Sequence, residues 1–288
     1  QDVVNEFGSN IKVYKGYDVD SDALDDALVG EAVSGIEEAD KVLVMLGLPP
    51  RYETEGIDRK TINLPAMQYE FLKIILNNHP KVVVSVHAGS VVNIDFNDSV
   101  SAVIMAYLSG QAGNEALLNI VMGNVSPSGR LAETFIKNDN DCNVAFTNQK
   151  NVYYDESIYV GYRYYSTFDV DVTYPFGHGL SYTKFSYSNI NLQSIEKDSK
   201  FILSFDITNT GTFSGKEVIQ VYVENNKSSV FKPKRELRSF KKVNLEPQET
   251  KHLVIEIKPE DFAYYDIFLK RFYTNKGTYK IQLGNNIN

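Results

Sequence analysis

The sequence predicts two domains of different class, a three-layer α/β sandwich over residues 1–180 and an all-β, two-sheet sandwich over residues 181–288. Three observations lead to this prediction. Apolar runs alternate with helical patterns in the first part, and short strands with period-two alternation fill the second. A length of 288 residues also favours two domains over one.

Three buried parallel strands are predicted in the first domain, near residues 42–46, 82–86 and 102–106. Each lies in a near-continuous apolar run (KVLVML, KVVVSV and AVIMAY), and the first run stops at Gly47. Strands that helices cover on both faces have this composition, because neither set of side chains meets water.

Helices are predicted after the first and third strands, over residues 65–78 and 112–122. The first pattern places Phe71 and Ile75 at helical spacing, and Pro65 suits a first turn. Strands and helices in this order indicate a parallel sheet with right-handed crossovers.

The second domain is predicted from short strands separated by polar turns. The strands are expected over residues 201–207, 217–223, 252–257 and 279–283. Between the domains lies a tyrosine-rich stretch, residues 138–179. We expect it to be a connector packed along both domains, because its aromatic side chains would be costly to leave in water.

Composition excludes several classes of function. The formal net charge of −8 argues against nucleic acid as the main partner, because binding phosphates requires a basic surface. No apolar run approaches the length of a membrane span, so no membrane partner is expected. Cys142 is the only cysteine, which leaves no intrachain disulfide and no cysteine cluster for zinc. No phosphate-binding glycine run follows a strand, and we expect no cofactor and no metal.

A charged segment, RYETEGIDRK at residues 51–60, follows the first predicted strand. Ligands of open α/β sheets gather at the carboxyl ends of the strands, which makes this loop a candidate site. Composition alone also allows a solvated loop whose carboxylates pair with neighbouring cations, and such loops are common.

His87 ends the second predicted strand and would lie at the same edge of the sheet. One reading places it near the site. The favoured reading is a satisfied, buried histidine, because one imidazole without a placed carboxylate specifies no reaction.

Four sequence motifs occur in an order that resembles family 3 glycoside hydrolases. TEGIDR at residues 54–59, followed by INLPAMQ, is similar to the family's acid/base segment. GQAG through SGRL at residues 110–131, YDESIYVGYRYY at residues 154–165 and YPFGHGLSYT at residues 174–183 resemble its later motifs. The resemblance covers nearly the whole chain. It implies that the second domain is an immunoglobulin-like sandwich of the fibronectin type III-like kind.

The resemblance implies a catalytic role for one carboxylate of the charged loop. Glu55 takes the position of the general acid/base, with Glu53 as the runner-up. Retaining glycosidases need such a group to hand a proton to the leaving oxygen. Tyr52, Asp58 and Arg59 are the candidate substrate-binding residues. Asp58 and Arg59 are also expected to pair with each other and hold the loop, and Tyr52 to pack within it.

The family's catalytic nucleophile lies in a (β/α)₈ barrel, which needs roughly 250 residues of its own. No barrel fits beside the two predicted domains, and the α/β domain looks truncated at its start. We therefore expect a fragment, largely inactive alone, whose partners are a carbohydrate substrate and the barrel domain of a parent protein. We also expect the charged loop to depend on that barrel for its order. The sequence leaves homo-oligomerisation open.

Two functions compete on these residues. The chain is either part of a hydrolase acting on β-linked glucosides or related sugars, or a non-catalytic carbohydrate-binding or structural module. The two hypotheses differ in whether Glu55 is needed for turnover once a barrel is supplied.

Overall fold

The computed structural model describes residues 10–144, 151–195, 200–225, 228 and 230–287. The chain forms two compact units. Unit 1 runs up to Met122 and includes Phe135–Asn140, and unit 2 consists of Gly123–Thr134 and Asp141–Asn288. The packing therefore does not follow chain order, and the sequential limits 1–180 and 181–288 stay a prediction.

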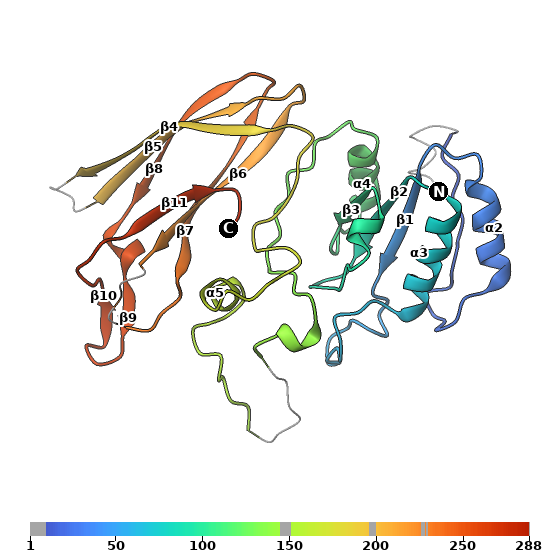
Figure 1. The fold of residues 1–288 in the computed structure, drawn as a ribbon, viewed down its shortest axis with the longest axis horizontal. Coiled ribbons are helices and arrows are strands. Elements are labelled where there is room, and N and C mark those ends of the chain that lie inside the picture. The colour runs from blue at the N-terminus through green and yellow to red at the C-terminus, as the bar shows by residue number, and fades with distance from the viewer. Residues whose placement is uncertain (1–9, 145–150, 196–199, 226–227, 229, 288) are drawn as a thin grey trace. The chain divides into compact units, whose positions relative to one another are not determined.

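Unit 1 is built on a parallel sheet of three strands in the order β1-β2-β3. Its strands are β1 (Val42–Gly47), β2 (Val82–His87) and β3 (Ala102–Met105). Its helices are α2 (Asp26–Ile36), α3 (Ala66–Asn78) and α4 (Gly113–Val121), with a short 3-10 turn, η1, at Asn97–Ser99. Figure 1 shows α2 and α3 on one side of the sheet and α4 on the other, which gives three layers. The predicted class is confirmed.

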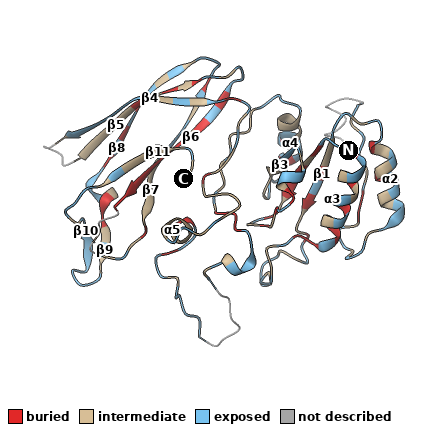
Figure 2. Ribbon diagram, in the orientation of Figure 1, coloured by how far each residue is buried: buried red, intermediate tan, exposed pale blue. Residues whose placement is uncertain are grey.

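The central strand carries the core of unit 1. Val82, Val84 and Val86 of β2 have no measurable exposure, and α3 also has buried positions, which are red in Figure 2. The outer strands are less enclosed than their apolar composition predicts. Met45 of β1 is 45% exposed, and β3 has no fully buried residue; among the described strands, each of these two pairs with β2 alone.

Helix α2 was not predicted from the sequence. Asp25 caps it by accepting hydrogen bonds from the backbone N–H groups of Ala27 and Leu28, which satisfies two donors of the first turn. Only Ala32 and Ile36 of the helix are buried. Its apolar stripe is therefore too narrow to stand out as a helical period.

Unit 2 contains an antiparallel sandwich of two sheets, with strand orders β4-β5-β8 and β11-β6-β7. The strands are β4 (Phe185–Ile195), β5 (Lys200–Asn209), β6 (Gly215–Glu224), β7 (Arg235–Leu245), β8 (Thr250–Ile257) and β11 (Lys280–Gly284). A 3-10 turn, η4 (Pro259–Phe262), leads into a hairpin of β9 (Tyr264–Asp266) and β10 (Arg271–Tyr273). The inward residues of β5, β6 and β8 form one apolar core, as an all-β sandwich requires.

The tyrosine-rich connector packs on the sandwich through α5 (Tyr162–Thr167), a helix that was not predicted from the sequence. The Tyr162 hydroxyl accepts a hydrogen bond from the backbone N–H of Leu237, and its ring stacks on Phe176 at 4.8 Å. Before α5, a second 3-10 turn, η2, spans Asp139–Asp141. These aromatic contacts explain why the connector belongs to unit 2.

A buried ion pair fastens the segment 123–134 to the sandwich. Both Glu217 carboxylate oxygens accept hydrogen bonds from Arg130 Nη2, at 2.8 and 2.9 Å. Their side chains are 7% and 2% exposed. Arg130 also donates to the carbonyl of Gly179. Leu131 exchanges backbone hydrogen bonds with residues 177 and 178. Two motifs far apart in sequence, SGRL and FGHGL, therefore meet in unit 2.

Candidate active site

The charged loop, residues 48–60, leaves the carboxyl end of β1 next to the segment that leaves β2. Gly47 and His87 are aligned across the two strands, and the backbone N–H of Leu48 donates to the His87 carbonyl at 2.9 Å. A Cβ atom at Gly47 would lie 2.3 Å from that carbonyl oxygen, so the close approach requires glycine. Both segments therefore start from one edge of the sheet, as the rule for open α/β sheets predicts.

Gln68 holds the end of β1 in place from α3. Its side-chain oxygen accepts from the Gly47 N–H at 2.9 Å, and its amide nitrogen donates to the Gly47 carbonyl at 2.8 Å. Gln68 is 1% exposed, and its polar atoms are satisfied by this exchange. The last residue of the INLPAMQ motif thus fixes where the charged loop begins.

Two side chains of the loop bind the segment after β2. Glu53 accepts hydrogen bonds from the Gly89 N–H at 2.6 Å and the Ser90 hydroxyl at 3.4 Å. Arg59 donates through Nη2 to the Ser90 hydroxyl at 2.7 Å and the Val91 carbonyl at 2.9 Å. Its Nη1 is buried and has no hydrogen-bond partner among the described residues. The expected local pair of Asp58 with Arg59 is not among the ion pairs of the described part of the chain, since Arg59 turns to Ser90 instead.

The start of the loop is hydrogen-bonded to Asp22 of unit 1. Arg51 donates to Asp22 at 2.8 Å, and the Tyr52 hydroxyl donates to the same carboxylate at 3.0 Å. The Arg51 guanidinium also lies over the Tyr52 ring, 4.9 Å from its centre. Accepting these bonds holds the pKa of Asp22 below its ordinary value. These contacts hold Tyr52 against Arg51 and Asp22, and its contact with a sugar stays a prediction.

The tip of the loop is a tight turn that carries Glu55. Thr54 and Ile57 form an isolated bridge, and Gly56 between them has φ of +81°, which favours glycine. Glu55 and Asp58 are both exposed. The hydrogen bonds of Glu53 and Arg59 anchor the loop within unit 1. The expectation that the order of the loop depends on a barrel stays a prediction.

His87 is half-buried at the same edge, and its Nε2 lies 3.0 Å from the hydroxyl of buried Ser85. Burial lowers the pKa of His87 below its ordinary 6.5. This environment favours a neutral, satisfied imidazole, and we assign it no chemistry.

We expect buried histidines to make the chain less stable in acid. Burial lowers the pKa of His87, and burial together with the Arg130 charge lowers that of His178. The unfolded chain then binds more protons below about pH 6.5, so the free energy of unfolding falls as the pH drops. A His87→Gln variant should lose less stability than the unaltered chain between pH 7 and pH 5 in denaturant titrations. An unchanged or steeper loss would contradict this assignment.

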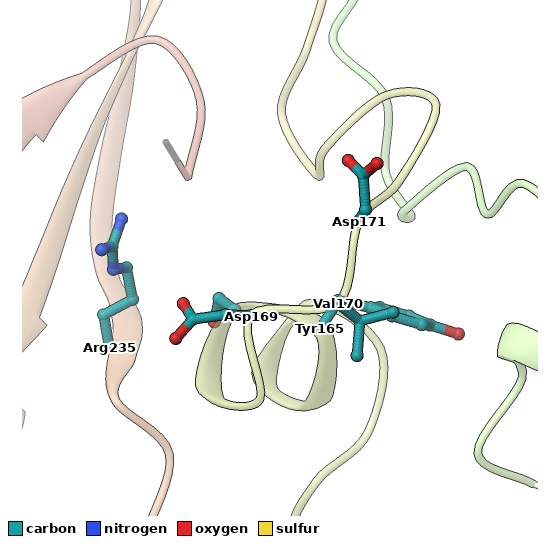
Figure 3. Close-up of a pocket in the computed structure, with 6 residues that line it drawn as sticks. Tyr165, Asp169, Val170, Asp171 and Arg235 are labelled. Atoms are coloured by element: carbon teal, nitrogen blue, oxygen red, sulfur yellow. The ribbon is translucent and has the colours of Figure 1, made fainter.

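Unit 2 contains a hollow of about 400 Å³ beside α5, shown in Figure 3. Asp169 extends toward Arg235 in this view, and Asp171 projects away from both. Asp169 pairs with Lys234 at 3.1 Å, and Arg235 Nε lies 3.6 Å from a Glu224 oxygen. These charges are paired within the sandwich, and we assign the hollow no catalytic role.

Comparison with known families defines the class of the protein. Residues 3–182 match the glycosyl hydrolase family 3 C-terminal domain, and residues 217–287 match the fibronectin type III-like domain. The chain belongs to glycoside hydrolase family 3, and the resemblance seen in the sequence is confirmed.

Similar proteins come from several organisms. The chain is 38% identical over 280 residues to thermostable beta-glucosidase B of Acetivibrio thermocellus, covering 96% of this chain and 37% of that protein. It is 35% identical over 288 residues to an exo-alpha-(1->6)-L-arabinopyranosidase of Bifidobacterium breve, with 98% and 38% covered.

Solved structures agree with this result. A GH3 beta-glucosidase of Bifidobacterium adolescentis superposes with a TM-score of 0.95 at 35% identity, covering 99% of this chain and 43% of that one. Beta-glucosidase of Kluyveromyces marxianus in complex with glucose gives 0.86 at 31% identity, with 96% and 33% covered. The chain thus spans less than half the length of these relatives.

No helix in the described ranges is both long enough and apolar enough to cross a membrane.

Proposed function

We propose that this chain supplies the general acid/base of a retaining glycoside hydrolase, and that Glu55 is that group. The observation that carries the proposal is the position of Glu55. It is exposed at the tip of a loop that is bound on both sides of it, through Glu53 and Arg59, at the carboxyl edge of the sheet. A proton donor must reach a substrate, and an exposed carboxyl on an anchored loop can do so.

Glu53 is the weaker candidate for the same role. One of its oxygens accepts from the Gly89 N–H at 2.6 Å and the other from the Ser90 hydroxyl. Both oxygens of this carboxyl group are thus engaged as acceptors by the segment after β2. Its contacts support a structural role, whereas Glu55 has its carboxyl group in solvent.

The reaction would proceed in two steps on β-linked glucosides or related sugars. Glu55 donates its proton to the glycosidic oxygen while a carboxylate from a barrel domain attacks the anomeric carbon and forms a glycosyl-enzyme. Glu55, now ionised, then takes a proton from the water that hydrolyses this intermediate. The two carboxyl groups must lie about 5 to 5.5 Å apart, and the proposal places the second on a barrel domain. Tyr52, Asp58 and Arg59 would border the sugar.

The test is reconstitution with a barrel domain taken from the parent protein. The isolated chain is expected to be inactive on aryl β-glucosides and aryl α-L-arabinopyranosides, because double displacement needs both carboxyl groups. Adding the barrel should produce turnover. The hydrolysis rate is followed by release of the phenol.

Turnover by the pure chain that disappears in a Glu55→Ala variant would show that the nucleophile lies within it. Sugar binding without turnover in the reconstituted protein would favour a non-catalytic carbohydrate-binding module.

A further inference from the structure

Three polar contacts from the two sides of the Glu55 turn converge on Gly89 and Ser90. Glu53 binds the Gly89 N–H and the Ser90 hydroxyl, and Arg59 binds the same hydroxyl from the other side of the turn. The Ser90 side chain is thus the one described group that contacts both arms of the loop.

The chemistry of a hydroxyl suits this position. Ser90 Oγ accepts a hydrogen bond from Arg59 at 2.7 Å and donates its own proton to Glu53 at 3.4 Å. One atom therefore joins a cation and an anion that would otherwise be linked only through the turn. The bond from Arg59 is short and charge-assisted, and such bonds are stronger than those between neutral groups, whereas the bond to Glu53 is long.

We call the contacts of Gly89 and Ser90 with Glu53 and Arg59 the junction, and the space around it is narrow. A Cβ atom at Gly89 would lie 3.2 Å from a Glu53 oxygen, closer than most such contacts. Only Ala88, which is buried, separates Gly89 from the end of β2 at His87. The segment that carries Ser90 therefore starts from the buried central strand of unit 1. The junction thus connects the Glu55 turn to the best-packed strand of the sheet.

We propose that Ser90 is a positioning residue that holds Glu55 at its working place through Glu53 and Arg59. The proposal rests on the assignment of Glu55 as the acid/base. Ser90 does not touch the reacting atoms. Its loss would widen the range of positions that Glu55 samples, and a misplacement of about 1 Å can lower a catalysed rate on the order of a hundredfold.

The first experiment uses the 288-residue chain and measures amide hydrogen exchange in the 48–60 loop. Ser90→Ala removes the junction, Ser90→Thr keeps the hydroxyl, and Ser101→Ala is the control at an exposed serine. Exchange in residues 53–59 should accelerate by at least about tenfold in Ser90→Ala, because bonds to two charged groups are lost. The other two variants should match the unaltered chain. Equal exchange in all four proteins would overturn the proposal.

The second experiment measures kinetics in the protein reconstituted with its barrel. Ser90→Ala should lower kcat by about tenfold to a hundredfold with KM within a factor of about two, and Ser90→Thr should restore kcat. A rise in KM with kcat unchanged would overturn the positioning role. Faster loop exchange together with a Glu55→Gln variant of full activity would instead disprove the assignment of Glu55, so the two ideas fail separately.

Discussion

Replacing Glu55 by glutamine is expected to lower the turnover of the reconstituted enzyme by about 10²- to 10⁴-fold, the usual contribution of a general acid/base. Glutamine keeps the size and polarity of the side chain but has no proton to donate to the glycosidic oxygen. Glu38→Gln is the matched control, because Glu38 is exposed outside the charged loop and the same substitution removes the same charge. Hydrolysis rates at saturating substrate measure the effect.

Substrates with different leaving groups distinguish a loss of acid catalysis from a distortion of the loop. A good leaving group departs without a proton, so kcat/KM of Glu55→Gln should approach the unaltered value on an activated dinitrophenyl glucoside. On an alkyl glucoside the same comparison should show the full loss. A loss of equal size on both substrates would mean that the variant has disturbed the loop and that Glu55 is not the acid.

Removing one partner of the buried Arg130–Glu217 pair is expected to destabilise the chain strongly. Glu217→Ala leaves the Arg130 guanidinium, 7% exposed, without its counter-charge. Breaking such pairs costs about 3 to 5 kcal/mol of the free energy of unfolding. Chemical denaturation followed by circular dichroism measures the loss.

Two further variants make the result interpretable. Glu256→Ala breaks the more exposed Lys200–Glu256 pair, whose side chains are 28% and 41% exposed, and should cost at most about 1 kcal/mol. Arg130→Met combined with Glu217→Leu removes both charges and should recover much of the loss. If Glu217→Ala costs no more than Glu256→Ala, the burial of the pair contributes little to stability.

The three strands of unit 1 and β5, β6, β8 and β11 of the sandwich could be predicted because their signals are local, whereas β4, β7, β9 and β10 were not predicted. Apolar runs at residues 42–46, 82–86 and 102–106 became β1, β2 and β3, and period-two alternation marked the sandwich. Helix α5 was missed for the opposite reason. Its six residues are ordered by tertiary contacts such as that of Tyr162 with Leu237, which no local pattern carries.

In the candidate site too, some features could be predicted from the sequence and others could not. The charged loop was placed at the correct edge of the sheet, because that follows from the strand order alone. Its anchors at Gly89 and Ser90 were missed, since they depend on the alignment of Gly47 with His87 across two strands. Sequence proximity suggested that Asp58 and Arg59 pair, but the curvature of the loop carries Arg59 to Ser90. The catalytic role of Glu55 itself stays a proposal.

The Arg130–Glu217 pair also constrains the order in which the chain can fold during its synthesis. The two residues are 87 positions apart, a delay of roughly 4 to 17 s at ribosomal speeds of about 5 to 20 residues per second. Phe135–Asn140 packs with unit 1 and can do so early in that interval. The segment 123–134 must wait for β6 to emerge. During this interval Arg130 has no counter-charge, while the residues on either side of its segment can already pack in unit 1. Unit 2 is then completed around the segment 123–134, which was synthesised several seconds earlier.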